Sequence, residues 1–186
     1  MFTKNFIKWT RLLFFYEAQS VVMVDGASHP VVRPYIMEEA FTLSHFMKQA
    51  KCEEAQVSLA TYKDYSGVYF GSGSAPATAD DYKLASPIIS GLTIQNPNTI
   101  HIFRKSDGVY TASATFLLTN TSGAEITISE VGLIGLISGR YSESASASYH
   151  RTCLLERQVL STPITIPDGD TKAVTYKLTF NQTQVV

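Results

Sequence analysis

Charged side chains are scarce in this sequence, and their scarcity argues against a nucleic-acid-binding protein. Asp, Glu, Lys and Arg make up 17% of the 186 residues, and the net charge is −1, whereas a typical soluble domain carries ~25% charged residues. A phosphate-binding surface needs clustered Lys and Arg, and the sequence contains no such cluster. We therefore expect no nucleic acid partner. The low charge also gives little self-repulsion, which suits a chain inside an assembly.

Cysteine is nearly absent, which excludes a disulfide-rich scaffold. Cys52 and Cys153 are the only two, and we favour two free, partly buried thiols over a disulfide between them. The histidines lack the close spacings of structural zinc sites. These are His29, His45, His101 and His150. We expect no metal and no cofactor.

Long apolar runs are missing as well, including at the N-terminus. Three cations interrupt residues 1–16, and the longest apolar run there is Leu12–Tyr16. This run is too short for the core of a signal peptide and far short of the ~20 residues of a membrane span. We therefore expect an amphipathic arm, with neither a targeting role nor membrane insertion.

Aromatic residues are concentrated in this arm. They are Phe2, Phe6, Trp9, Phe14, Phe15 and Tyr16. The rings could form a surface for docking a partner, or they could belong to the core. Because six large rings exceed what one short strand buries in its own domain, we assign them to an assembly arm.

The first third of the chain carries the only convincing helical pattern. Short β-like runs, Val21–Val24 and Val31–Ile36, flank a turn at residues 25–28. A helix is expected over Glu38–Lys51, because its apolar residues recur every three or four positions and its charges follow the helix dipole. We expect residues 1–56 to pack on, or dock from, a main domain over residues 57–186.

The rest of the chain reads as a succession of short strands separated by turn residues. The expected strands are Val57–Tyr62, Val68–Phe70, Ile88–Ile94, Thr99–Arg104, Val109–Leu118, Ile126–Ile137, Leu154–Leu160, Thr162–Ile166 and Ala173–Phe180. Residues 141–149 are expected to form a loop of small residues. This spacing predicts an all-β fold, an antiparallel β-sandwich of jelly-roll-like type. One helix is too few for the crossovers of an α/β fold.

Known catalytic and ligand-binding motifs are incomplete in this sequence. Gly71-x-Gly73 lacks the third glycine and the Lys-Ser/Thr pair of a phosphate loop, so we interpret it as a tight turn. Asp80 and Asp81 could bind a divalent cation together with Glu130, but a solvated turn is the better reading. No G-x-S-x-G occurs. We expect no catalytic residues and no enzymatic activity.

Glu130 and Arg157 are charged residues within apolar strands. Glu130 shares its alternating face with Ile126 and Ile128, and Arg157 lies between apolar pairs at residues 154–155 and 159–160. A buried carboxylate without a partner is costly. We therefore predict a structural ion pair between Glu130 and Arg157, in preference to a general-acid role for Glu130.

Three stretches resemble a family of small β-rich virion proteins of tailed bacteriophages. Phe70–Leu84 is similar to the family's G-x-G-x-x-P-x-x-x-D-x-x-L segment, and Ile126–Leu133 to its I-x-E-(I/V)-G-L strand. The third stretch begins L-L-x-R at Leu154 and ends Y-x-(L/I)-x-F at Phe180. Each motif alone is weak, but their order and spacing over residues 70–180 make the resemblance more specific.

The resemblance implies a non-enzymatic structural component of the virion, in the tail, fibre, neck or capsid-accessory class. Its expected partners are copies of itself and other virion proteins, and it would be assembled in the cytoplasm of the bacterial host. The alternative is a receptor- or glycan-binding module on the virion surface, with Tyr141 and Tyr149 as aromatic candidates in the long loop. The fold alone does not decide between these functions.

Overall fold

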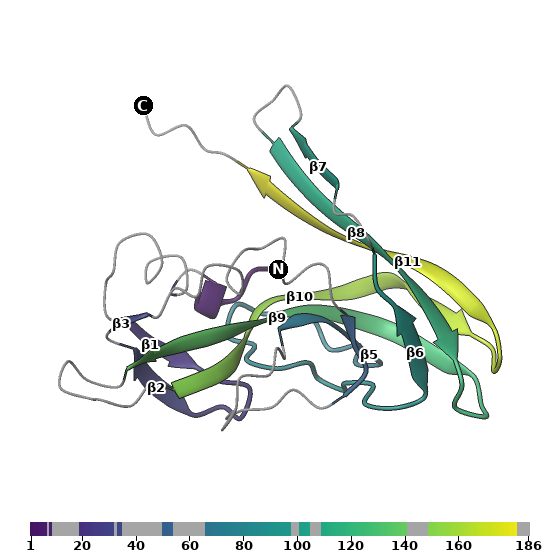
Figure 1. Cartoon of the computed structure of the whole chain (residues 1–186), viewed down its shortest axis with the longest axis horizontal. Helices are drawn as coiled ribbons and strands as arrows, with labels where there is room; N and C mark the ends of the chain where they lie inside the picture. Colours follow the sequence, from purple (N-terminus) through teal and green to yellow (C-terminus); the bar gives the residue numbers. More distant parts are fainter. Residues whose placement is uncertain are drawn as a thin grey trace.

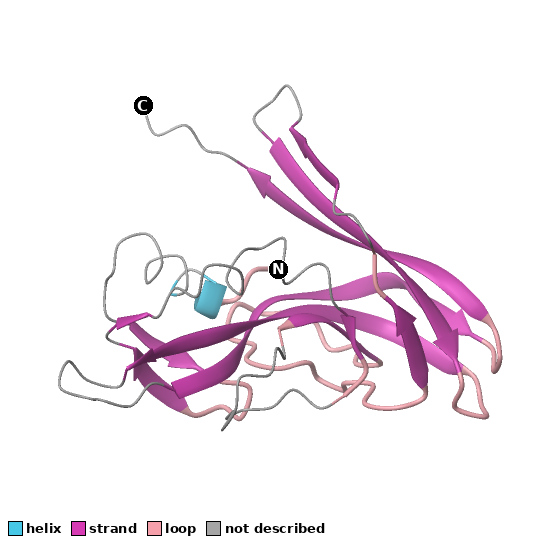
Figure 2. Cartoon of the chain, viewed as in Figure 1, coloured by secondary structure: helices cyan, strands magenta, loops and turns pink. Residues whose placement is uncertain are grey.

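The regular structure of the described part of the chain consists of β-strands joined by loops, with almost no helix (Figure 2). The computed structural model describes residues 1–6, 8, 19–31, 33–34, 50–53, 66–97, 101–104, 109–140 and 149–181. The strands are β1 (Gln19–Val22), β2 (Ser28–Val31), β3 (Arg33–Pro34), β4 (Ala50–Lys51), β5 (Gly67–Gly71), β6 (Leu92–Gln95), β7 (His101–Arg104), β8 (Val109–Asn120), β9 (Ile126–Arg140), β10 (Tyr149–Ile166) and β11 (Thr171–Asn181). The prediction of an all-β protein is confirmed.

The larger sheet has the order β10-β9-β5-β4, with β3 paired to the far end of β9. All its pairs are antiparallel except β4 with β5, so the expectation of purely antiparallel pairing is wrong at this one contact. Every residue of β5 is buried, as is every residue of β9 from Ile128 to Leu136. A strand buried on both faces is mostly apolar, and in this stretch of β9 only Ser129 and Glu130 are polar.

The smaller sheet has the order β11-β8-β6, with β7 also paired to β8. Its strands alternate as predicted: Phe116 and Leu118 are fully buried, whereas Thr115 and Leu117 are exposed. The rings of Phe70 and Phe116, one from each sheet, meet edge to face at 6.1 Å. The two open sheets therefore share one core along part of their length. The start of β8 and the end of β11, together with β7, extend away from the larger sheet (Figure 1).

A hairpin of β1 and β2 forms the turn expected at residues 25–28. Gly26 has a φ of +85°, which glycine adopts without steric cost, and the Ala27 amide donates to Asp25 Oδ1 at 2.8 Å. The Val24 amide donates to the Thr152 carbonyl on β10, at 3.3 Å. The hairpin is thereby joined to the larger sheet.

Several predicted boundaries differ from the structure. Ala50 and Lys51, expected at the end of a helix, form β4, and residues 38–49 of that helix lie outside the described residues. Residues 88–91 are not a strand, because Gly91 has a φ of +84° and strand β6 starts only after it. The two strands expected at 154–160 and 162–166 are one strand, β10, and a register shift between Val159 and Ile164 accommodates the proline between them. The strand expected at 57–62 and the loop residues 141–148 lie outside the described residues.

Candidate functional site

Glu130 and Arg157 form an ion pair inside the larger sheet. Glu130 lies on β9 and Arg157 on the adjacent β10, and both residues are at least 98% buried. Arg157 Nε donates to Glu130 Oε2 at 2.7 Å. The structure therefore contains the contact that the sequence predicts.

Backbone amides from the loop after β5 complete the surroundings of Glu130. Its Oε1 accepts hydrogen bonds from the amides of Gly73 and Ser86, at 3.2 and 2.7 Å. Its Oε2 accepts one from the Ala85 amide at 3.1 Å, in addition to that from Arg157. Each carboxylate oxygen thus has two donors, and such charge-assisted bonds are the strong kind.

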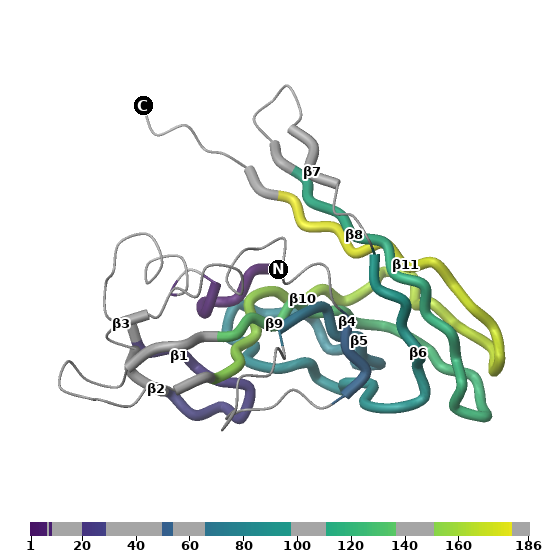
Figure 3. The backbone as a smooth tube through the Cα atoms, in the orientation of Figure 1, coloured from purple at the N-terminus to yellow at the C-terminus, as the bar shows by residue number. Residues whose placement is uncertain are grey.

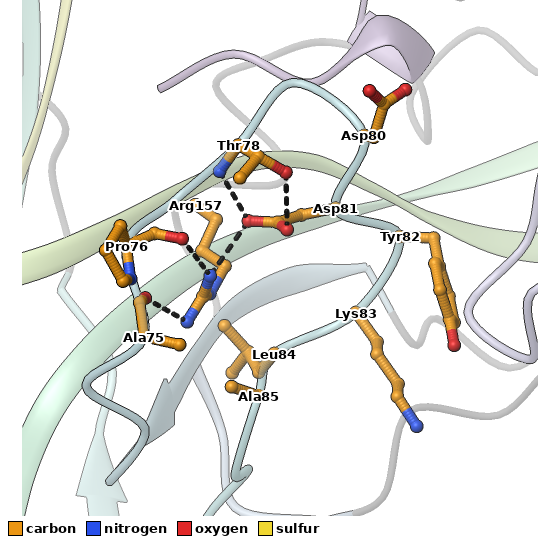
Figure 4. A pocket seen from close by; sticks show the side chains of 10 residues that line it. All are labelled: Ala75, Pro76, Thr78, Asp80, Asp81, Tyr82, Lys83, Leu84, Ala85 and Arg157. Atoms are coloured by element: carbon orange, nitrogen blue, oxygen red, sulfur yellow. Dashed lines mark hydrogen bonds and ion pairs between the residues drawn. The ribbon is translucent and has the colours of Figure 1, made fainter.

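Arg157 is held on its outer side by the same loop (Figure 4). Its Nη1 donates to Asp81 Oδ2 at 2.8 Å and its Nη2 to the Ala75 carbonyl at 3.0 Å. Asp81 also accepts from the amide and the hydroxyl of Thr78, at 2.9 and 2.8 Å. One guanidinium therefore joins β9, β10 and both halves of the loop.

Asp81, interpreted from the sequence as part of a solvated turn, is mostly buried and pairs with Arg157. Burial raises the pKa of its carboxyl, but hydrogen bonds from the Thr78 amide and from Arg157 outweigh this, and the pKa lies below its ordinary value. Asp80 points away from Arg157 in Figure 4 and pairs with Lys4 at 2.6 Å. In the part of the chain that the structure describes, no three His, Cys, Asp or Glu side chains gather into a metal site.

The glycines of the loop leave space for the Glu130 side chain. A Cβ at Gly71 would lie 2.5 Å from Glu130 Oε1 and 2.6 Å from the Ser86 carbonyl oxygen, and a Cβ at Gly73 would lie 2.5 Å from Oε1. Real Cβ atoms essentially never approach so closely. The sequence indicates a tight turn at Gly71-x-Gly73. In the structure the two glycines let the backbone of the loop pass close to the buried Glu130 carboxylate, where a side chain would not fit.

The charge of Arg157 is stabilised by its two carboxylates. Burial lowers the pKa of its guanidinium, but hydrogen bonds and charge from Asp81 and Glu130 outweigh burial and raise the pKa. General acid–base catalysis needs a proton or lone pair within reach of a substrate. The oxygens of Glu130 are occupied by their donors, so the arrangement is suited to holding the loop in place.

A second buried carboxylate, Glu156, was not singled out from the sequence. Tyr176 on β11 donates its hydroxyl to Glu156 Oε2 at 2.7 Å, which links the two sheets. The α-ammonium group of Met1 lies 2.9 Å from Glu156 Oε1. Burial, and then the negative charge of Glu156, raise the pKa of Tyr176 well above its ordinary value.

Residues 1–3 lie along β10, and the chain that follows them bonds to Ala79 and to β1 (Figure 3). Thr3 is buried and donates its hydroxyl to the Leu154 carbonyl at 2.7 Å, and the Asn5 side chain bonds to both backbone groups of Val22. The rings of Phe2 and Phe6 stack at 4.3 Å and pack against the core. Of the two alternatives for the aromatic residues, these two rings therefore follow the core alternative and do not project as an assembly arm. Trp9, Phe14, Phe15 and Tyr16 lie outside the described residues.

Both cysteines are free thiols, in line with the reading preferred from the sequence. Burial raises the pKa of Cys153, which is fully enclosed, and also that of Cys52. Thiols of raised pKa carry little thiolate and are poor nucleophiles.

A cavity of about 360 Å³ opens beside the outer side of Arg157 (Figure 4). The loop lines it with polar and aromatic groups, including Asp80, Tyr82 and Lys83. The Nζ of Lys83 lies 5.7 Å from the centre of the Tyr82 ring.

Comparison with known proteins gives no match: no family model, no curated protein and no solved structure is similar to this chain. Among the described residues, no helix has the length and apolar character required to cross a membrane.

Proposed function

We propose that this chain is a non-enzymatic structural component of a tailed-bacteriophage virion, assembling with copies of itself or with neighbouring virion proteins. The observation that carries the proposal is the convergence of the three stretches that resemble virion proteins. The first supplies Gly73 and Asp81, the second Glu130 and the third Arg157, and these residues form one buried network.

This network explains why such motifs would recur together in a structural protein. A buried charge must be neutralised and hydrogen-bonded, so the three segments need one another. The network uses its polar groups to fix a long loop to two strands. We extend the proposal to a jelly-roll-like sandwich, which the shared core of the two sheets supports.

Recovery of the chain in purified virions tests the proposal. Phage particles would be produced in a bacterial culture by the phage that encodes the chain, purified on a density gradient and analysed by mass spectrometry. An abundant cytosolic protein of the host serves as the contamination control. We expect the chain to co-sediment with the capsid proteins in constant ratio. A chain that stays in the soluble fraction with the host protein would refute the proposal.

A receptor- or glycan-binding module on the virion surface is the second candidate, favoured by the cavity beside Arg157. Its volume of about 360 Å³ falls in the range of ligand sites, ~300–1,000 Å³, and Tyr82 supplies an aromatic wall. Tyr82→Ala should then abolish binding to host cells, while Ser74→Ala in the same loop should leave it unchanged. Equal binding by both variants would remove this candidate.

A further inference from the structure

Strand β11 is the edge of the smaller sheet. Among the described residues it pairs only with β8, in an unbroken antiparallel ladder from Thr171 to Asn181. The other side of an edge strand presents backbone amides and carbonyls to any further strand. Among the described residues no further strand occupies this side of β11, although the Gln158 side chain reaches one of its carbonyls.

The outward-facing backbone groups can be assigned to particular residues. In an antiparallel ladder the amide and carbonyl of one residue point to the same side, and the side alternates along the strand. The Lys177 carbonyl faces away from β8, since it accepts a hydrogen bond from Gln158 Nε2 at 3.3 Å. Residues an even number of positions from Lys177 have the same orientation, so the amides and carbonyls of Ala173, Thr175 and Thr179 face outward as well.

Threonines recur at every fourth position on the solvent-facing side of both strands. β8 carries Thr111, Thr115 and Thr119, and β11 carries Thr171, Thr175 and Thr179. The register places each threonine of β8 directly opposite one of β11. Two of these pairs are joined by hydroxyl hydrogen bonds, of 2.9 Å between Thr115 and Thr175 and 2.7 Å between Thr119 and Thr171.

The threonines of β11 are placed symmetrically about Thr175, and this makes the edge self-complementary. We propose that β11 pairs antiparallel with β11 of a second copy, with Thr175 on the two-fold axis. Thr171 then lies opposite Thr179 of the second copy, and the threonine pairs continue across four strands. The proposal rests on the proposed assembly function and names the surface that performs it.

The outward-facing backbone groups of β11 and the position of its charged residue fit this register. The amide and the carbonyl of Thr175 both face outward. Thr175 and Thr175 of the second copy would therefore exchange two backbone hydrogen bonds and form a hydrogen-bonded pair. Lys177 would lie opposite Ala173 of the second copy, so the two copies of Lys177 are four residues apart. Like charges directly opposite are destabilising, and this register avoids them.

A cleft of about 140 Å³ lies beside the same edge, lined by residues of β10 and β11 and, from the larger sheet, of β5 and β9. Its lining is mixed: apolar Leu160, Ile164 and Val174 stand beside polar Gln158 and Thr175, and the described lining includes no charged residue. The cleft is smaller than a typical ligand site of ~300–1,000 Å³. A neighbouring strand at the edge would cover it and bury its apolar walls.

Cysteine cross-linking tests the register directly. Thr175→Cys in a Cys52→Ser background should form a covalent dimer on mild oxidation, since hydrogen-bonded antiparallel partners have Cα atoms about 5.5 Å apart, within disulfide range. Thr115→Cys is the matched control on β8. In the proposed dimer its two copies are three strand spacings apart, about 14 Å, and should not cross-link. Equal cross-linking of both variants, or of neither, would overturn the register.

Sedimentation of charge variants provides a second, independent measurement. Thr175→Lys places two lysines opposite each other and should weaken dimerisation about fivefold or more, whereas Thr115→Lys, equally exposed on the same face, should not. If both variants associate like the wild type, assembly uses another surface: the inference fails while the proposed function stands. A wild-type protein that remains monomeric at all concentrations also overturns the inference, and virion recovery then tests the function separately.

Discussion

The two sheets of this protein bury their residues in different ways. The larger sheet is covered on both faces around β9 and contains the charged residues Glu130, Glu156 and Arg157, each at least 98% buried. Along β8 and β11 of the smaller sheet, buried residues such as Phe116 and Leu178 alternate with solvent-facing ones, most of which are polar, such as Thr115. Polar residues of the larger sheet are buried in fully bonded contacts, whereas most polar residues of the smaller sheet cover a solvated face. Substitutions should therefore have unequal effects in the two sheets.

The largest effect is expected from separating Glu130 and Arg157. Glu130→Gln leaves the buried Arg157 with Asp81 as its one carboxylate partner, and Arg157→Met leaves the buried Glu130 with backbone amides alone. Breaking a buried ion pair typically costs about 3–5 kcal/mol. The double variant should recover part of that loss. Denaturant unfolding of the wild type, both single variants and the double variant measures this coupling. Strictly additive losses would contradict an energetic role for the pair.

A smaller loss is expected from filling the space beside Glu130. Gly71→Ala brings a methyl group against the Glu130 carboxylate and the Ser86 carbonyl, and overpacking of this kind costs about 1–3 kcal/mol. Ser74→Ala, at an exposed position of the same loop, is the control and should be near neutral. Thermal unfolding of the two variants checks the contrast, which disappears if the loop can move away from Glu130.

The larger sheet should also lose stability in acid through Asp81. Its pKa is lowered in the folded protein, so the folded state holds this proton less tightly than the unfolded state does. The resulting stabilisation is complete above the ordinary carboxyl pKa of ~3.9 and is lost as pH falls through the lower folded value. Asp81→Asn should therefore be less stable at neutral pH and show a flatter stability profile below about pH 4. Parallel profiles for the two proteins would rule out this contribution.

The smallest effect is expected on the outer face of the smaller sheet. Thr115→Val removes the hydroxyl contact to Thr175 at an exposed site, and such surface changes usually stay within about 0.5 kcal/mol. Equilibrium unfolding of this variant, compared with Glu130→Gln, sharpens the contrast between the sheets. A loss similar to that of Glu130→Gln would mean that both sheets depend equally on polar contacts.

The strands and the Glu130–Arg157 contact were accessible from sequence because they depend on local patterns. Alternation along β8 is visible in the sequence, and a charged residue inside an apolar strand indicates a buried partner. Local patterns do not reveal that the loop after β5 binds the Glu130 carboxylate. Gly71 and Gly73 resemble ordinary turn glycines, and only the three-dimensional structure shows the carboxylate that they accommodate.

Glu156 carried the same signal as Glu130 and was missed. It stands between Leu155 and Arg157 in a buried run, but its hydroxyl partner, Tyr176, belongs to the other sheet. Pairing across sheets depends on how they pack, which strand periodicity does not specify. The merging of two expected strands into β10 has a similar origin, because the register shift before Ile164 depends on pairing with β9.

The wide sequence separation within the Glu130 network has a consequence for synthesis of the chain. The loop amides at residues 73–86 leave the ribosome first and Glu130 follows, but Arg157 is added 27 residues later. Until then the Glu130 carboxylate has no guanidinium beside it and remains hydrated. The network therefore cannot close before Arg157 has been synthesised, and a nascent chain that stops before this residue cannot complete the larger sheet.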